Sequence, residues 1–306
     1  QDESGKIISP LNMGWPDVAD LNYDNMEMRA EMIACMKYWV EEYDIDGFRC
    51  DYANGAPLEF WESARQELNT VKPVLMLAED NTVKDLLNTA FEFNYNWELY
   101  DALRSVANGT KQANVIKLYI PKNYPNGSFT LNFLDNHDKN AYEHTIVDAL
   151  PAMFSLIYTI PGAPLIYTGD EIGLDHALAF MERDPVDWSS GTGDYRSFLS
   201  ALAAIRAQHP ALWCGNYGGE IEFTDLGNKN VLAFSREKDG DTVLCLFNFS
   251  KKEQTVELSA FLDQSEKVLL CGQGGEVWNT EAHPVSDDAL NGEVTLQPWT
   301  YWVLTR

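Results

Sequence analysis

Three carboxylates, Asp51, Glu79 and Asp138, stand at or shortly after the end of a short apolar run. Arg49 lies two residues before the first of them, and His137 directly precedes the third. Cleavage of a glycosidic bond needs two carboxyl groups, one that protonates the leaving oxygen and one that attacks the sugar or activates water. These residue types therefore fit glycoside hydrolysis, if the fold brings them together.

The local pattern indicates a role for the first two carboxylates. Side chains alternate along a strand, which places Arg49 and Asp51 on one face and Cys50 on the other. A guanidinium keeps a neighbouring carboxylate ionised, so Asp51 is a candidate nucleophile. A carboxyl in a partly apolar pocket has a raised pKa, which makes Glu79 a candidate proton donor. Taken alone, each residue also fits a structural role as an ion pair, a helix cap or a strand end.

A hydrolytic metal centre is the competing interpretation of the same segments. Such centres recruit several histidine and acidic ligands from different strands. His137, His144 and His176 form neither an HxH nor an HExxH pattern. We therefore assign no metal ligand.

The elements that must position these residues alternate between strand and helix over residues 1–215. This alternation predicts βαβ units, in an open doubly wound sheet or in a (β/α)8 barrel. Neither GxGxxG nor GxxxxGK[ST] occurs, and polar residues follow successive strands, so we favour an incomplete (β/α)8 TIM barrel with about its last five strands. The predicted strands are Ile45–Cys50, Val74–Ala78, Phe91–Tyr95, Phe129–Leu134 and Pro164–Tyr167, and the predicted helices span about 25–42, 57–68, 83–88, 98–106, 142–158 and 195–208.

The first helix carries its own signals. Apolar residues from Met28 to Tyr43, Trp39 among them, fall on one helical face. Asp24 followed by Glu27 resembles a capping box and predicts the start of the helix there.

The pattern over residues 216–306 differs from that of the first part. Short strand patterns separated by turn residues predict a small antiparallel β-sandwich domain after the barrel portion of residues 1–215. Asp239 and Gly240 form a predicted hairpin turn inside it.

Charge and composition exclude several partners. The 306 residues include 47 acidic and 22 basic ones, a formal charge of −25, which is the wrong sign for binding nucleic acid or an anionic membrane. No apolar run approaches the roughly 20 residues of a membrane span. The compartment is not determined, and a secreted or periplasmic one is favoured. Five cysteines are predicted to be buried free thiols: Cys35, Cys50, Cys214, Cys245 and Cys271.

At the residues discussed above, the sequence resembles glycoside hydrolase family 13, the α-amylase family. Residues 47–51 are similar to the GFRxD motif of its fourth barrel strand, and residues 136–138 to the NHD motif after its seventh strand. Further similar segments are Pro16-Asp17 with Asp20-Leu21-Asn22, Gly162 to Glu171, and the loop with Arg183, Asp184 and Trp188.

The resemblance implies roles that the local pattern leaves open. It implies that Asp51 is the nucleophile, that Glu79 is the general acid and base, and that Asp138 binds and distorts the sugar. It also implies substrate binding by three residues: Arg49, His137 and Arg183.

In this family, three strands and an inserted domain come before GFRxD, so they would lie before Gln1. We therefore expect the chain to be the C-terminal part of a larger enzyme that associates with its own N-terminal barrel segment or with itself, because an opened sheet leaves unpaired backbone groups. Asn54-Gly55 stands where many α-amylases have Lys-His. That departure affects the calcium contact that many family members make at this position. The calcium that the resemblance implies for the intact enzyme would be bound through residues that precede Gln1. No other cofactor is expected.

The expected function is retaining hydrolysis of α-1,4-glucans such as starch and maltooligosaccharides, as in α-amylases. Another activity of the family, such as that of a cyclomaltodextrinase, an α-glucosidase or a transglycosylase, is an alternative. A catalytically incomplete protein that only binds glucans is a second alternative, and a metal-dependent hydrolase is a third.

Overall fold

The structure is a computed structural model that describes residues 4–7, 15, 18–81, 84–120, 124–140, 147–174, 176–262, 265–274, 283–284 and 292–306. The chain divides into two compact units, Gln1–Tyr95 and Asn96–Arg306. The predicted boundary after residue 215 lies inside the second unit and stays a prediction. None of the helices in the described part of the chain is both long and apolar enough to cross a membrane.

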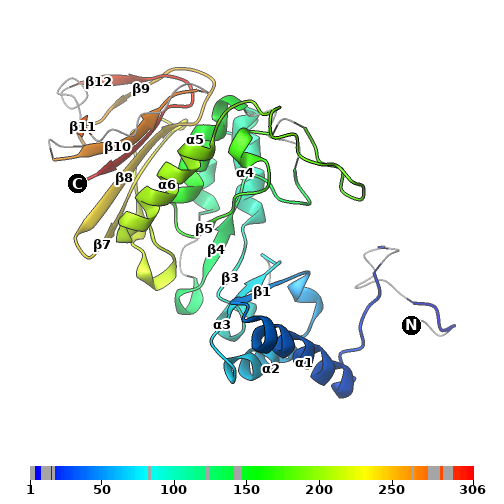
Figure 1. The fold of residues 1–306 in the computed structure, drawn as a ribbon. Coiled ribbons are helices and arrows are strands. Elements are labelled where there is room, and N and C mark those ends of the chain that lie inside the picture. The colour runs from blue at the N-terminus through cyan, green and yellow to red at the C-terminus, as the bar shows by residue number, and fades with distance from the viewer. Residues whose placement is uncertain are drawn as a thin grey trace. The chain divides into compact units, whose positions relative to one another are not determined.

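The first unit contains three parallel strands in chain order with helices beside them (Figure 1). In the ladder Arg49 lies opposite Leu77, and Leu77 lies opposite Phe93 on the other side. All three strands and the helices between them fall where the sequence predicts them, within a few residues. The elements are α1 (Met26–Tyr43), β1 (Gly47–Cys50), the 3-10 turn η2 (Ala53–Gly55), α2 (Leu58–Asn69), β2 (Leu75–Ala78), α3 (Leu86–Thr89) and β3 (Phe93–Tyr95).

The N-terminus of α1 is capped by Asn25. Its side-chain oxygen accepts hydrogen bonds from the backbone N–H groups of Glu27 and Met28, at 3.0 and 3.2 Å. An N-cap side chain reaches the second and third helical N–H groups, and from Asn25 these are residues 27 and 28. The predicted capping box with Asp24 is therefore wrong by one residue.

The predicted apolar face of α1 is only partly covered. Met32 and Met36 are partly buried and Val40 is buried. Cys35 and Trp39, which directly precede Met36 and Val40 in the chain, are exposed. The prediction of buried thiols is thus wrong for this first cysteine. All five thiols are free, and the other four are buried (Cys50, Cys245) or partly buried (Cys214, Cys271).

The second unit begins with helices and two parallel strands, β4 and β5, in which Leu131 lies opposite Ala163. Both strands are shorter than predicted. Helix α5 is buried along its whole length, as expected of a helix that is apolar on all sides. The predicted start of that helix near residue 142 lies outside the described residues. The elements are α4 (Trp97–Ala107), η3 (Ala113–Leu118), η4 (Pro125–Gly127), β4 (Phe129–Asn132), η6 (Val147–Ala149), α5 (Leu150–Thr159), β5 (Ala163–Pro164), η7 (Asp170–Ile172), α6 (Arg196–Gln208), η8 (Pro210–Leu212) and η9 (Gly215–Tyr217).

An antiparallel β-sandwich completes the second unit. A six-stranded sheet has the order β11-β10-β13-β8-β7-β6, and a two-stranded sheet pairs β12 with β9. The strands are β6 (Glu220–Thr224), β7 (Val231–Lys238), β8 (Asp241–Asn248), β9 (Gln254–Glu257), β10 (Lys267–Gly272), β11 (His283–Pro284), β12 (Glu293–Leu296) and β13 (Tyr301–Thr305).

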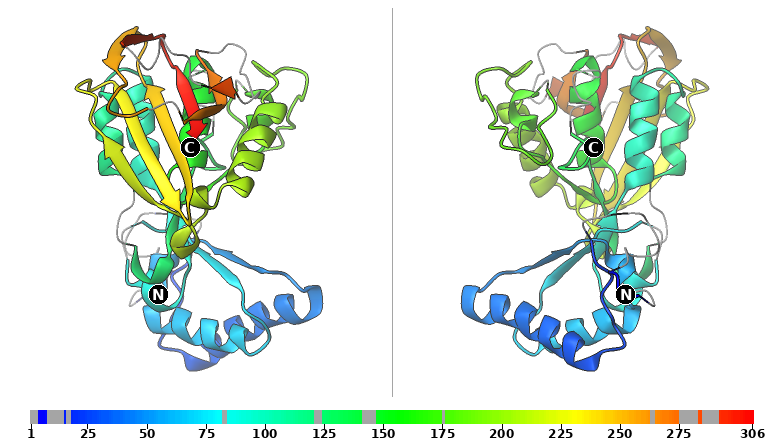
Figure 2. Two further views of the ribbon diagram at one scale, coloured as in Figure 1. Left: turned by 90° about the vertical axis from the view of Figure 1, so that its left-hand side faces the viewer. Right: turned by 90° about the vertical axis from the view of Figure 1, so that its right-hand side faces the viewer.

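The six-stranded sheet buries both of its faces. Leu232 and Phe234 of β7 belong to the core that includes α4, α5 and α6, whereas Val231 and Ala233 belong to the core shared with β9 and β12. This period of two is the alternation of a strand. Figure 2 shows the sheet alongside the helices.

The hairpin turn between β7 and β8 is the one that the sequence predicts. Asp239 and Gly240 both have positive φ, +53° and +86°, as a two-residue type I′ turn requires. The parallel strands with their helices and the antiparallel sandwich together confirm the predicted fold class.

Candidate active site

Arg49, Asp51 and Glu79 meet at the ends of β1 and β2. The Nη1 atom of Arg49 donates a hydrogen bond to Oδ1 of Asp51 at 2.5 Å. Its Nη2 atom lies 2.9 Å from Oε1 of Glu79. One guanidinium therefore contacts both carboxylates that were expected to act on the glycosidic bond.

The two carboxylates differ in exposure. The side chain of Asp51 is 78% exposed and that of Glu79 is 18% exposed. Glu79 is thus the more enclosed of the two carboxylates, and the roles that the resemblance implies for them stay predictions.

Arg49 stays positively charged. Burial of its guanidinium acts to lower its pKa, but hydrogen bonds to Tyr95 and Asp51 and the charge of Glu79 outweigh that effect and raise the pKa. The Nε atom donates to the hydroxyl of Tyr95 at 3.3 Å, and the guanidinium carbon lies 5.6 Å from the centre of that ring. The cation is thus held from one side by an aromatic ring and from the other by carboxylates.

The residue after Asp51 has an unusual backbone conformation that serves the site. Tyr52 has φ +44° and ψ +51°, a left-handed conformation that costs a residue other than glycine roughly 1–2 kcal/mol. In this conformation its N–H donates to Oε2 of Glu79 at 2.9 Å. Backbone strain of this kind is concentrated at functional sites.

The second set of predicted residues lies in the second unit, after β4. Nε2 of His137 and Oδ2 of Asp138 are 3.4 Å apart. Buried Asn136 sets the turn, since its side-chain oxygen accepts from the N–H groups of Asp138 and Lys139, both at 2.9 Å. An asparagine that closes its own turn in this way fixes the direction of the side chains that follow.

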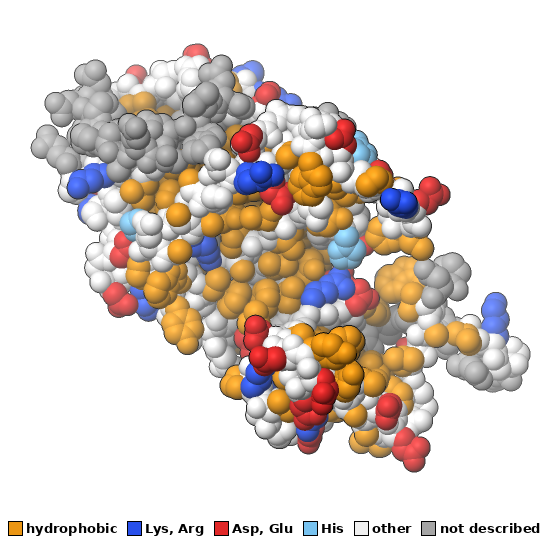
Figure 3. All heavy atoms as spheres, in the orientation of Figure 1, with side chains coloured by type: hydrophobic (Ala, Val, Ile, Leu, Met, Phe, Trp, Pro, Cys, Tyr) orange, Lys and Arg blue, Asp and Glu red, His pale blue; other side chains and the backbone are white. Residues whose placement is uncertain are grey.

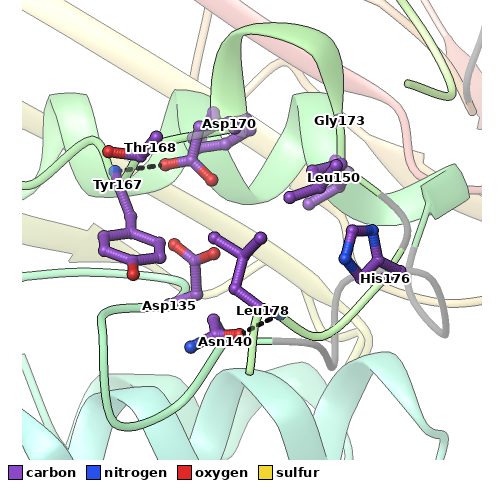
Figure 4. Close-up of a pocket in the computed structure, with 12 residues that line it drawn as sticks. Asp135, Asn140, Leu150, Tyr167, Thr168, Asp170, Gly173, His176 and Leu178 are labelled. Carbon is purple, nitrogen blue, oxygen red and sulfur yellow. Dashed lines mark hydrogen bonds between the residues drawn. The ribbon is translucent and has the colours of Figure 1, made fainter. Parts of the chain in front are cut away.

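A small cavity with both polar and apolar lining residues lies beneath this turn (Figure 4). Asp135 and Asp170 are buried in its wall, and the N–H of Tyr167 donates to Oδ2 of Asp170 at 2.8 Å. Burial raises the pKa of the Tyr167 hydroxyl, and the charges of Asp135 and Asp138 add to the effect. The cavity measures about 10 Å³, near the lower limit for one water molecule, so no sugar ring fits in it.

Arg183 lies on an exposed loop between η7 and α6. The neighbouring Asp184 accepts hydrogen bonds within that loop, from the N–H of Ala179 at 3.0 Å and from Nε2 of His176 at 3.2 Å. The backbone bond, then the histidine, lowers the pKa of Asp184.

The structure thus places five of the predicted residues in two groups, and Arg183 on the exposed loop between η7 and α6. Arg49, Asp51 and Glu79 form the first group, and His137 and Asp138 form the second. The predicted site residues do not include Tyr95, Tyr52 or Asn136. Tyr95 could have been found, because it ends a predicted strand as the carboxylates do. The strained turn at Tyr52 has no signal in the residue type.

Comparison with known proteins decides the family. The family described as alpha amylase, catalytic domain, matches residues 10–213, which is most of the chain. The chain belongs to the α-amylase family. The maltogenic amylase C-terminal domain matches residues 221–302, which hold the antiparallel strands. The resemblance to this family is confirmed, although the matches do not test the role of any single residue.

Similar proteins of this family carry several names. Alpha-amylase MalA of Haloarcula japonica is 27% identical over 83% of this chain and 38% of its own length. An intracellular maltogenic amylase of Bacillus subtilis is 27% identical over 82% of this chain and 45% of its own length. A cyclomaltodextrinase of Geobacillus thermopakistaniensis is 27% identical over 87% of this chain and 47% of its own length. The chain spans less than half the length of these relatives.

Solved structures share the fold. The maltogenic alpha-amylase AmyB of Thermotoga neapolitana superposes with a TM-score of 0.80 at 24% identity, over 100% of this chain and 71% of that one. An Anoxybacillus alpha-amylase gives 0.78 at 20% identity, over 98% of this chain and 69% of that one. The five parallel strands are therefore part of a TIM barrel, and the antiparallel domain follows it.

Two further expectations concern the compartment of the protein and a bound metal ion. Some relatives are named intracellular, so the comparisons do not support the expected secreted or periplasmic location. In the described part of the chain, no group of three or more histidine, cysteine, aspartate or glutamate residues is placed to hold a metal ion. The calcium expected in the intact enzyme, through residues that precede Gln1, is not tested by this finding and stays a prediction.

Proposed function

We propose that the protein hydrolyses α-1,4-glucosidic bonds of starch and maltooligosaccharides with retention of configuration. One observation carries the proposal. Arg49 contacts both Asp51 and Glu79, at 2.5 and 2.9 Å. A retaining enzyme needs these two carboxyl groups close together, about 5 to 5.5 Å apart, and we predict that separation here.

In the first step, Glu79 gives its proton to the leaving glycosidic oxygen while a carboxylate oxygen of Asp51 forms a bond to the anomeric carbon. The bond to the leaving oxygen breaks, and the products are a glycosyl ester of Asp51 and an ionised Glu79. In the second step, Glu79 takes a proton from water, and the water oxygen displaces Asp51 from the sugar. Both residues return to their first protonation states.

The shared contact with Arg49 suits this exchange. One negative charge is present in each state, on Asp51 before the first step and on Glu79 after it. A guanidinium that contacts both groups stabilises the charge wherever it lies, with no movement of its own. Asp138 and His137 are proposed to bind and distort the sugar, and Arg183 to contact the substrate beyond it.

The test is covalent trapping with an activated 2-deoxy-2-fluoro-α-glucosyl fluoride, followed by mass analysis of peptides. We expect the label on Asp51, and we expect Asp51→Asn to abolish both the labelling and the hydrolysis of soluble starch. Asp44→Asn is the matched control, an exposed carboxylate near the start of the same strand. Hydrolysis that persists in Asp51→Asn, or a product of inverted configuration, would reject the mechanism.

A second activity of the family is supported by the names of the relatives, which include maltogenic amylases and a cyclomaltodextrinase. The products distinguish the alternatives. Maltose from cyclodextrins indicates a cyclomaltodextrinase, glucose from the chain end indicates an α-glucosidase, and longer products than the substrate indicate transglycosylation. Binding without turnover indicates a protein that only binds glucans.

We further propose that the exposed strand edges are covered by a barrel segment. Among the described pairs within each unit, β1 pairs with β2 alone and β5 pairs with β4 alone. Leu75 and Ile166, on or beside these strands, are 48% and 42% exposed. Light scattering on the isolated chain tests this proposal. Association, reversed by adding the preceding barrel segment of the full-length protein, supports it, whereas a monomer of high thermal stability contradicts it.

A further inference from the structure

Glu79 is held through its backbone and its side chain by the turn that follows β1. Its N–H donates to the carbonyl of Cys50 at 2.9 Å, and its own carbonyl accepts from the N–H of Ala53 at 3.3 Å. Its side-chain atom Oε2 accepts from the N–H of Tyr52 at 2.9 Å. The first two contacts position the backbone of Glu79, whereas the third fixes one oxygen of its carboxyl group. The direction of that carboxyl group therefore depends in part on where the N–H of Tyr52 points.

The direction of the Tyr52 N–H is set by a left-handed backbone conformation, with φ +44° and ψ +51°. A residue other than glycine keeps such a conformation only where its surroundings hold it. The far side of the turn is anchored to α2, because Nε1 of Trp61 donates to the carbonyl of Ala53 at 2.8 Å and both residues are buried. On the near side, the aromatic ring of Tyr52 itself is packed against two neighbours.

The first neighbour is Gly55, which leaves room for the ring. A Cβ atom at residue 55 would lie 2.5 Å from both Cδ1 and Cε1 of Tyr52. That is well inside the roughly 3.5–4.0 Å at which non-bonded carbon atoms pack. The φ of Gly55 lies outside the left-handed region, so the backbone there does not require glycine. What glycine provides at this position is the space that the ring of Tyr52 occupies.

The second neighbour is Trp15. The centroids of the Trp15 and Tyr52 rings are 5.2 Å apart and their planes make an angle of 76°, the edge-to-face arrangement that aromatic pairs favour. Trp15 is 37% exposed, and Figure 3 shows that apolar side chains reach the surface in several places. Its exposure therefore does not distinguish Trp15, but its contact with Tyr52 does.

We propose that Gly55 and Trp15 position the carboxyl group of Glu79. They hold Tyr52 in the turn that directs its N–H toward Oε2, so they act through Tyr52 and are positioning residues. This inference rests on the proposed function, in which Glu79 gives a proton to the leaving oxygen and later takes one from water. Proton transfer requires the carboxyl group within hydrogen-bond reach of the reacting oxygen. A carboxyl group that loses the Tyr52 contact therefore transfers protons more slowly, and the loss falls on substrates whose leaving group needs a proton.

The test compares kcat/KM of the full-length protein and its Gly55→Ala variant on two substrates, phenyl α-maltotrioside and dinitrophenyl α-maltotrioside. Phenol needs a proton to leave, whereas dinitrophenol departs without one, and kcat/KM reports the step in which they leave. We expect Gly55→Ala to lower kcat/KM by about tenfold on the phenyl substrate and by less than about twofold on the dinitrophenyl substrate. A loss of fold or of substrate affinity would instead lower both values equally.

A second variant tests whether the effect passes through Tyr52. In Gly55→Ala/Tyr52→Gly the ring that the new Cβ meets is absent, and glycine adopts a positive φ without steric cost. We expect this double variant to regain at least about threefold of the lost kcat/KM on the phenyl substrate. Trp15→Ala is expected to lose about threefold on the phenyl substrate alone. Gly292→Ala is the matched control, because a Cβ atom there meets no described atom within 4 Å, and it is expected to leave both substrates unchanged.

The results separate this inference from the proposed function. Equal losses of Gly55→Ala on both substrates, or no loss on either, overturn the positioning role while hydrolysis by the wild type stands. A double variant no better than Gly55→Ala overturns the route through Tyr52. A wild type that hydrolyses neither substrate rejects the proposed function and the inference together. Near-ultraviolet circular dichroism checks the fold, and if Gly55→Ala is unfolded, the ratio of the two losses in Trp15→Ala, at a partly exposed position, decides in the same way.

Discussion

Arg49 and Asp51, two residues apart on β1, form an ion pair with 2.5 Å between Nη1 and Oδ1. The other amino group of the same guanidinium lies 2.9 Å from Glu79. The last pair of the ladder joins Cys50 to Ala78, so the next residues, Asp51 and Glu79, follow side by side. The relative position of the two candidate catalytic carboxyls depends on this register and on one arginine.

Replacement of Arg49 by lysine is expected to lower kcat on starch by about a hundredfold or more. Lysine keeps the charge, but its single ammonium group lacks the planar fork that contacts both carboxylates at once. The measurement is steady-state hydrolysis, with denaturant unfolding to exclude a loss of fold. Arg29→Lys is the control, because Arg29 forms a looser ion pair with Glu59, at 3.6 Å in the same unit. An Arg49→Lys enzyme with the wild-type kcat would contradict the shared role.

Glu79→Gln is expected to affect substrates according to their leaving groups. Glutamine accepts the hydrogen bond from Tyr52 but cannot protonate an oxygen, so kcat on starch should fall by about 10²–10⁴. The first step on an aryl glucoside with an acidic phenol should fall much less, because that leaving group departs without a proton. Pre-steady-state release of the phenol measures this step. Equal losses on both substrates would argue against Glu79 as the acid, and Glu59→Gln serves as the control.

Stability is expected to fall in alkaline solution because of two buried thiols. Burial raises the pKa of Cys50 and of Cys245 to about 12, from 9.0 in the unfolded chain. Between these values the unfolded chain loses protons that the folded chain keeps. The neutral thiols therefore make their full contribution to the free energy of unfolding below pH 9. This contribution is lost as the pH rises toward 12, at about 1.4 kcal/mol per pH unit for each thiol.

Denaturant titrations in a reducing buffer at pH 8 to 11 measure this effect. We expect Cys245→Ala to be less stable at pH 8, because it leaves a small cavity, but to lose stability with pH less steeply than the wild type. Cys35→Ala, at an exposed position, is expected to keep the wild-type slope. Parallel curves for the wild type and Cys245→Ala would show that this thiol is not responsible.

Arg236 is expected to be among the most sensitive positions for stability. Although only 2% exposed, it donates to the backbone carbonyls of Thr159, Leu212, Trp213 and Gly219, and burial lowers its pKa. Its removal leaves buried carbonyls without donors, so Arg236→Leu should cost at least about 2 kcal/mol.

Lys238, two residues further along β7, provides the matched control for that substitution. Its ammonium group contacts one carbonyl, that of Asn216, at an exposed position. Lys238→Leu should change the free energy of unfolding by no more than about 0.5 kcal/mol. Similar losses for the two variants, measured by denaturant unfolding, would show that the carbonyl contacts of Arg236 matter little.

Much of the fold could be predicted because its signals lie in short windows of sequence. The alternation of strand and helix, the change of pattern after residue 215 and the turn at Asp239-Gly240 depend on neighbours within a few positions. The boundaries of β4 and β5 could not be predicted from the sequence. A strand ends where its hydrogen-bonded pairing ends, and that depends on a partner strand distant in the chain. The cap of α1 failed by one residue, since Asp24 and Asn25 have similar capping propensities and only the path of the chain distinguishes them.

The sequence by itself determined which residues could do chemistry: the carboxylates, the arginine two residues from Asp51 and the family motifs that contain them. Only the tertiary structure decided that one guanidinium serves both Asp51 and Glu79, that Tyr52 adopts a left-handed turn to reach Glu79, and that Trp39 is exposed although it continues an apolar pattern. The physical reason is that identity and periodicity are local properties of the chain. Contacts between residues 27 and 30 positions apart, Tyr52 or Arg49 with Glu79, require a strand register, and exposure depends on what else packs on the same face.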